Sequence, residues 1–217
     1  MTFKTLSISL SAAVALALPA AAQEVTHLPD GALQSVSFDL GLQSALVYRA
    51  AYSRHIGSGL LDGRFTLPAA GLDFHDFAVE AGGQVTALAA GSWRLDVAFA
   101  PTLRLTENNL FSATALGVRG LLLPGYQGER WGLMAEVGYE KILATRMKHS
   151  SLYRSVGYAG AKDGWYSLTG GTLQAGLRGG YRIGRVELTL AAGVLTSEGL
   201  NEVMPPFYGT LGTSYAF

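Results

Sequence analysis

The sequence lacks three things that would each favour a familiar class of protein. It contains no cysteine, so it has neither a disulfide framework nor a thiolate metal site. After Ala22 it has no apolar run of the roughly 20 residues that a membrane-spanning helix needs. It has no excess of charge, because 16 basic residues balance 16 acidic ones, and this gives no reason to expect nucleic-acid binding.

The N-terminus has the three parts of a secretory signal peptide. Lys4 supplies a positive charge, residues 6–18 are mostly apolar, and Pro19 precedes three alanines that suit cleavage. We therefore predict a removed signal peptide over residues 1–22, with cleavage near Ala22. The polar residues 23–33 are expected to form a periplasmic lead-in to a single domain over residues 34–217.

Hydrophobic residues make up 49% of the chain, and after the N-terminus they are spread by alternation. In residues 93–105 the odd positions are mostly apolar, whereas Arg94 and Asp96 occupy even positions. Alternation with a period of two predicts β-strands that have one apolar and one polar face. Because lipid cannot hydrogen-bond a backbone, a sheet that spans a membrane must close on itself. The pattern therefore predicts a transmembrane β-barrel.

Counting the alternating stretches gives eight strands. The first is expected to run without a break from Val36 to Tyr52, because one parity stays apolar throughout. Long connections are expected at 54–72, 147–164 and 197–206, with a short one at 106–109 on the same side, and tight turns at 89–92, 123–129 and 183–184 on the other. External loops of such barrels are long and periplasmic turns short. We therefore expect an all-β fold, a closed antiparallel eight-stranded transmembrane β-barrel with both termini in the periplasm.

The last eleven residues, Phe207 to Phe217, also alternate and end on an aromatic residue, with Tyr215 two positions earlier. This segment resembles the C-terminal signal strand of bacterial outer-membrane β-barrel proteins. The resemblance implies the outer membrane of a Gram-negative bacterium and recognition of Phe207 to Phe217 by the barrel-assembly machinery. The mature chain resembles the small OmpA-type and opacity-type barrels in architecture. The first long strand and Gly57-Ser58-Gly59 give a weaker resemblance to the MipA/OmpV group of scaffolding barrels.

The inward parity of the strands carries many charges. An eight-stranded barrel is only about wide enough inside for side chains to fill, so we predict a closed lumen in which arginines pair with carboxylates. The alternative is a narrow channel, since charges at membrane depth are candidates for an ion path. The predicted network comprises Asp39, Arg49, Glu80, Arg94, Asp96, Arg104, Arg119, Glu136, Glu140, Arg178, Arg182, Arg185 and Glu187. Trp93, Trp131, Tyr181 and Phe217 are expected to form a periplasmic aromatic girdle.

One short constellation could carry catalysis. His149 is followed by Ser150 and Ser151, and Glu136 and Glu140 precede it in the sequence. Some small outer-membrane barrels act on lipid A, and lipid A deacylases use a serine and a histidine near the membrane surface with an acidic partner. That resemblance gives His149, Ser150 and Ser151 as an alternative catalytic site, because a serine hydroxyl needs a neighbouring base to become a nucleophile.

The preferred hypothesis is a non-enzymatic barrel that acts in envelope integrity or in surface binding through loops 54–72 and 147–164. Cationic and aromatic side chains suit a lipopolysaccharide partner, which is anionic. The contact candidates are Lys148, His149, Tyr153, Arg154, Tyr158, Lys162 and Trp165. No metal ligand set is expected, because the four histidines are widely separated in the sequence. No cofactor is expected either.

Overall fold

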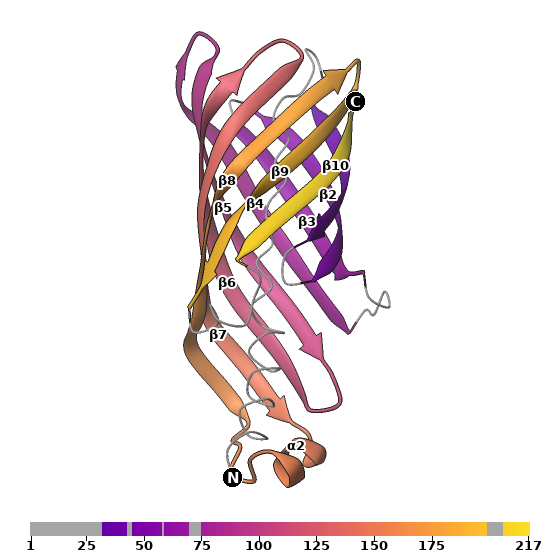
Figure 1. Ribbon diagram of the computed structural model, residues 1–217, viewed down its shortest axis with the longest axis vertical. Coiled ribbons are helices and arrows are strands. Elements are labelled where there is room, and N and C mark those ends of the chain that lie inside the picture. The colour runs from indigo at the N-terminus through magenta and orange to yellow at the C-terminus, as the bar shows by residue number, and fades with distance from the viewer. Residues whose placement is uncertain (1–31, 43–44, 58, 70–74, 199–205) are drawn as a thin grey trace.

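The computed structural model describes residues 32–42, 45–57, 59–69, 75–198 and 206–217 (Figure 1). The predicted signal peptide and most of the lead-in lie outside these ranges. Within them the chain forms ten strands and one short helix, namely β1 (Gln34–Leu42), β2 (Leu46–Ile56), β3 (Gly59–Pro68), β4 (Asp76–Ala90), β5 (Trp93–Glu107), β6 (Phe111–Gln127), β7 (Trp131–His149), α2 (Ser151–Val156), β8 (Gly164–Ile183), β9 (Val186–Ser197) and β10 (Phe207–Ala216). No helix of the described ranges is long and apolar enough to cross a membrane.

The strands form a closed antiparallel barrel. Each strand pairs with its neighbours in the sequence, and β1 pairs with β10 to close the ring. The prediction of an all-β closed antiparallel barrel is confirmed. The predicted number of strands is wrong, because the barrel has ten strands instead of eight. Both additional strands lie in the first third of the chain.

The first additional strand comes from the stretch expected to be one long strand. Residues 36–52 are divided between β1 and β2, which pair from Leu42 with Leu46 to Gln34 with Arg54. Paired residues in an antiparallel sheet point to the same face. Since 42 and 46 are both even, the apolar parity is unchanged by the reversal of the chain. The alternation therefore carries no sign of the turn.

The second additional strand lies inside the expected loop 54–72. β3 pairs with β2 on one side and with β4 on the other. Gly59, Gly63 and Pro68 made this stretch appear to be a loop, and Gly63 lies exposed at a position where other strands carry an apolar side chain. Arg64 of the same strand is buried. A tight turn expected at 123–129 is also corrected, because β6 continues through it to Gln127.

The connections differ between the two ends of the barrel. One end, called here the short-turn end, has two- or three-residue connections at 57–58, 91–92, 128–130 and 184–185. Phe217 lies at this end, where its carbonyl oxygen accepts a hydrogen bond from the backbone N–H of Leu33 at 3.2 Å. The opposite end, called the long-loop end, has connections of up to 14 residues, the longest at 150–163. Ten strands, like the eight expected, are an even number. The start of β1 and Phe217 therefore lie at the same end of the barrel, as expected.

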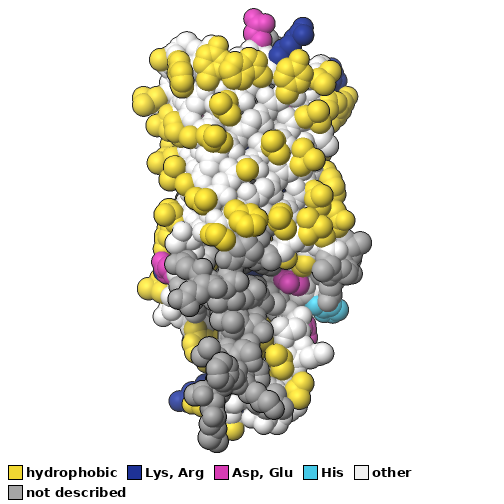
Figure 2. Space-filling model, in the orientation of Figure 1, with side chains coloured by type: hydrophobic (Ala, Val, Ile, Leu, Met, Phe, Trp, Pro, Cys, Tyr) yellow, Lys and Arg dark blue, Asp and Glu magenta, His cyan; other side chains and the backbone are white. Residues whose placement is uncertain are grey.

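The outer wall of the barrel is apolar. The exposed large hydrophobic side chains include residues from all ten strands, and Figure 2 shows them spread over the part of the barrel near the short-turn end. Aromatic side chains gather at this end: the Tyr126 ring contacts those of Trp93 and Trp131, with centroids 5.7 and 4.9 Å apart. Tyr181 pairs with Trp131 across β7 and β8. Such an apolar wall is suited to contact with lipid.

The three longest strands lie side by side, and β7 and β8 project furthest at the long-loop end (Figure 1). β6, β7 and β8 have 17, 19 and 20 residues, whereas β1 has nine. A strand of about 9–11 residues spans a bilayer. The pairing of β7 and β8 shifts between Ile142 and Ala144, next to the projecting part. This extension of β6, β7 and β8 carries α2 at its tip (Figure 1).

Candidate functional site

The barrel interior contains a charge cluster around Glu80 of β4. Its Oε2 lies 2.8 Å from Nη2 of Arg119 and 3.5 Å from Nη1 of Arg64. Arg64 also contacts Asp62, at 2.8 Å. Arg64 and Asp62 are absent from the predicted network, because they lie in the stretch that was interpreted as a loop. Their even positions, shared with Glu80, were the signal that could have revealed them.

A second cluster is centred on Glu136 of β7, whose side chain is fully buried. Arg178 donates to its Oε2 through Nε and Nη2, at 3.0 and 2.5 Å. Gln174 and Tyr208 donate to its Oε1 at 2.6 and 2.7 Å. Four donors from β8 and β10 therefore converge on one carboxylate. Tyr208 is absent from the predicted network, although its even position in the alternating last strand places it on the face opposite Tyr215 and Phe217.

Two further carboxylates accept hydrogen bonds from side chains of other strands. Nη2 of Arg104 donates to both carboxylate oxygens of Glu140, at 2.8 and 2.7 Å, and Oγ1 of Thr102 donates to its Oε1 at 3.3 Å. Asp96 accepts hydrogen bonds from Gln84 and Thr86, both at 2.8 Å, and pairs with Arg94. These contacts connect β4, β5 and β7 across the lumen. The interior is therefore crossed by charge-assisted hydrogen bonds, which are stronger than neutral ones.

The remaining members of the predicted network lie in different surroundings. Asp39 and Arg49 are buried opposite each other on β1 and β2, and Glu187 is buried on β9. Arg182 is only half-buried and donates to the carbonyl oxygen of Glu129. The structure places Arg185 in the exposed turn before β9, away from the buried clusters.

At the long-loop end, Asp163 contacts both the end of β7 and the helix α2. Its Oδ1 accepts the backbone N–H of His149 at 2.8 Å and lies 3.1 Å from the Nδ1 of that residue. Its Oδ2 lies 2.8 Å from Nη2 of Arg154. The backbone N–H of His149, followed by the Arg154 guanidinium, lowers the pKa of Asp163 to about 2. One carboxylate thus connects both ends of the loop.

The two serines of the alternative catalytic site have different surroundings. Ser150 is the N-cap of α2, where its Oγ accepts the backbone N–H of Tyr153 at 3.1 Å. Ser151 is exposed in the first turn. The acidic residue beside His149 is Asp163, while Glu140 lies nine residues away along β7, at roughly 30 Å for an extended strand. His149 is engaged by the Asp163 contact and by the ring of Tyr153, 4.9 Å away.

The loop residues proposed for binding form a cationic and aromatic surface. Lys148 and Lys162 are exposed, as are Tyr158 and Trp165 with exposed fractions of 60% each. Arg154 is half-buried in its contact with Asp163. Among the described residues there is no group of three or more His, Cys, Asp or Glu side chains that could hold a metal ion.

A closed antiparallel barrel with an apolar wall and a charged interior defines a class, the small transmembrane β-barrels. No protein-family model matches the chain, and no curated protein matches it. Solved structures of similar shape include the KdgM porin (10% identity, 84% of this chain and 99% of that one, TM-score 0.42). They also include Ail, the attachment invasion locus protein of Yersinia pestis (14%, 86% and 99%, 0.40), and the outer-membrane protease OmpT of Escherichia coli (8%, 89% and 99%, 0.45). Likeness at this level carries no argument about activity.

Proposed function

We propose that the protein is an outer-membrane β-barrel that binds lipopolysaccharide through the extension of β6, β7 and β8. The apolar wall supports a position within a membrane. The short turns and the aromatic cluster of Trp93, Tyr126 and Trp131 support an orientation with the short-turn end in the periplasm, because aromatic residues favour the interface and periplasmic turns are short. The long-loop end then faces outward.

The observation that carries the binding proposal is the pair of exposed lysines on the extension. Lys148 stands at the end of β7 and Lys162 just before β8, on either side of α2. Exposed Tyr158 and Trp165 lie in the same segment. Phosphate groups of lipopolysaccharide are anionic, so cationic side chains at the membrane surface attract them. Aromatic rings add contact with the sugars and acyl chains nearby.

Arg154 has a different role in this proposal. Its guanidinium is held by Asp163 at 2.8 Å, so its replacement would loosen α2 as well as remove a charge. The contact with Asp163 positions the loop, and the lysines supply the charge for binding.

The ion pairs of the interior connect strands across the lumen and stabilise the barrel, which supports the proposal that the lumen is closed. Recognition of Phe207 to Phe217 by the barrel-assembly machinery belongs to the same proposal, since β10 forms the closing seam with β1.

The test is the double variant Lys148→Ala/Lys162→Ala, refolded in detergent and titrated with purified lipopolysaccharide. Loss of two surface cations should raise the Kd by roughly tenfold or more. The control is Arg54→Ala, which removes an exposed cation from the short-turn end and should leave the Kd unchanged. Equal affinities for the lysine variant and the unaltered protein would remove lipopolysaccharide as the partner of this surface.

A further inference from the structure

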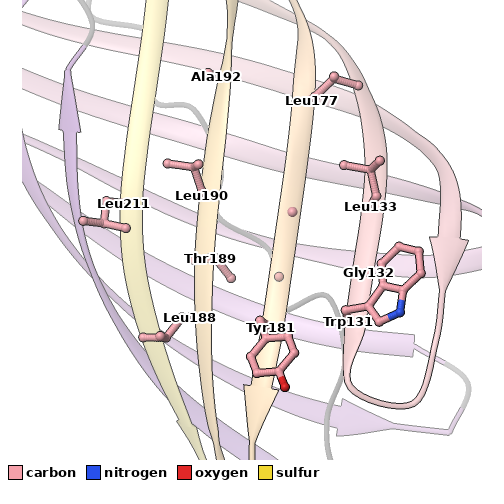
Figure 3. A pocket seen from close by; sticks show the side chains of 12 residues that line it. Trp131, Gly132, Leu133, Leu177, Tyr181, Leu188, Thr189, Leu190, Ala192 and Leu211 are labelled. Carbon is pink, nitrogen blue, oxygen red and sulfur yellow. The ribbon is translucent and has the colours of Figure 1, made fainter.

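A groove lies on the outer wall of the barrel, across β7, β8 and β9 near the short-turn end (Figure 3). Its volume is about 540 Å³, and nearly all its lining is apolar. Leu133 and Leu190 flank Gly179, which pairs with both of them in the sheet. Trp131 and Tyr181 lie at one end of the groove and Leu177 toward the other. The lining is therefore that of a site for a hydrocarbon chain.

The groove exists because Gly179 occupies a position on the outward face. In β8 the neighbouring outward positions carry Leu177 and Tyr181, which are both exposed. A Cβ added at Gly179 would approach only the carbonyl oxygen of Gly132, at 3.8 Å, an ordinary contact. The backbone there would thus tolerate a side chain. The absence of one leaves a gap in the apolar wall.

A second cavity adjoins the groove, with a volume of about 460 Å³ and a lining that includes Tyr181, Arg130 and Arg182. Tyr181 lines both cavities. The backbone N–H of Arg182 donates to the carbonyl oxygen of Arg130 at 2.7 Å, which keeps the two arginines adjacent. The Nη1 atom of Arg182 is buried and makes no hydrogen bond within the described part of the chain.

This second cavity, called here the mouth of the groove, lies beside the two turns 128–130 and 184–185, which carry charged residues. Arg130 and Arg185 are exposed, and Arg182 is half-buried. The acidic groups are Glu129, which is exposed in the same turn as Arg130, and Glu187, which is buried in the lumen opposite Arg182. Arg130 and Arg182, which line the cavity, therefore lie beside one exposed carboxylate. The mouth favours an anionic group.

We propose that the groove and its cationic mouth bind one anionic glycerophospholipid of the periplasmic leaflet. An acyl chain would fill the gap at Gly179, and the phosphate would lie against Arg130 and Arg182. The proposal rests on the membrane position proposed above and is independent of lipopolysaccharide binding. Zwitterionic phosphatidylcholine has the same chains and phosphate, but its ammonium group would face the arginines. Phosphatidylglycerol should therefore bind more tightly than phosphatidylcholine.

The three tryptophans of the chain allow a direct test. The variant Trp93→Phe/Trp165→Phe retains Trp131, which lines the groove. It is reconstituted in phosphatidylcholine vesicles, and quenching of its fluorescence by brominated phosphatidylglycerol and brominated phosphatidylcholine is compared. A preference for phosphatidylglycerol of about fivefold is expected from charge-assisted contacts. The variant Trp131→Phe/Trp165→Phe retains Trp93, at the same end but outside the groove, and should show no preference.

Two substitutions separate the parts of the site. Arg130→Gln, in the background that retains Trp131, should abolish most of the preference by removing the exposed charge. Gly179→Leu should weaken quenching by occupying the groove, whereas Gly120→Leu is its control because nothing lies within 4 Å of a Cβ added there. Heat-modifiable migration on gels checks that every variant is folded.

The outcomes distinguish the two proposals. If neither brominated lipid quenches the retained tryptophans, the proposed membrane position is wrong. If both lipids quench Trp131 equally, or if Gly179→Leu leaves the preference intact, the phospholipid site is refuted and the membrane position stands. A preference at Trp131 that is lost in Arg130→Gln and in Gly179→Leu supports the site.

Discussion

Replacement of Arg178 by Met should lower the free energy of unfolding of the barrel by about 3–5 kcal/mol, the range seen when one partner of a buried ion pair is removed. Arg178 and Glu136 have exposed fractions of only 1% and 0%. Removal of the guanidinium leaves the Glu136 carboxylate in place, now without a cationic partner. The loss therefore includes the desolvation of an unpaired charge as well as the contact itself.

The geometry around Glu136 sets the size of the effect. Arg178 supplies two of its four hydrogen bonds, at 3.0 and 2.5 Å, and hydrogen bonds to charged groups are worth about 1.5–3 kcal/mol each. Gln174 and Tyr208 continue to donate to Oε1 after the substitution, so the carboxylate is not left wholly unsatisfied. Glu136→Gln/Arg178→Met should recover part of the stability, because no buried charge remains.

The assay is urea-induced unfolding in phospholipid bilayers, followed by tryptophan fluorescence in both directions to establish reversibility. The control is Lys141→Met, which breaks an ion pair with Glu198 that has N···O 2.6 Å but is exposed to solvent. Exposed pairs contribute little, so this variant should remain close to the parent protein. If Arg178→Met loses no more stability than Lys141→Met, the lumen does not impose the desolvation on which the estimate depends.

Two other predictions concern the lumen wall and the loop. Gly193→Ala should lower the free energy of unfolding by about 1–3 kcal/mol. The added Cβ would overlap the carbonyl oxygen of Ala175 and come within 2.6 Å of the Gly176 Cα. The control is Gly63→Ala, whose Cβ meets nothing within 4 Å and which should be tolerated in the same unfolding assay. The contact of Asp163 with the backbone N–H of His149 should be fully formed at pH values above about 4, the ordinary pKa of a carboxyl group. It should be lost as the pH falls through about 2, because the pKa of Asp163 is lowered in the folded loop. The amide chemical shift of His149 reports this transition in NMR spectra, and a midpoint near pH 4 would contradict the assigned contact.

Alternation alone predicted the closed antiparallel barrel, because each strand of such a barrel needs apolar side chains on the face that meets lipid. This requirement acts on every strand. It could not count the strands, since the pairing of Leu42 with Leu46 reverses the chain without changing the parity of the apolar face. β3 was missed for a different reason. Glycine at position 63 removes the outward side chain that would have continued the pattern, so local composition resembled a loop.

The buried charges followed from the same parity, but their partners did not. Glu136 belongs to β7, while Arg178 and Tyr208 come from β8 and β10. Their convergence depends on how the barrel closes and on the relative register of strands far apart in the sequence. Asp163 is similar, because its contact with His149 spans the whole α2 segment. Strand faces are local in sequence, whereas contacts across a lumen or a loop are not.

The unequal strand lengths have a consequence for aggregation. Closure removes every free strand edge only where each strand has two neighbours. In the extension, residues 164–167 and Gly170 of β8 pair with β7 but with no other strand of the described ranges, so one edge of the sheet faces water. Leu168 has φ of +50° there, and the register beside it is irregular. Such distortions disfavour pairing with a second chain, which protects this open edge of β8.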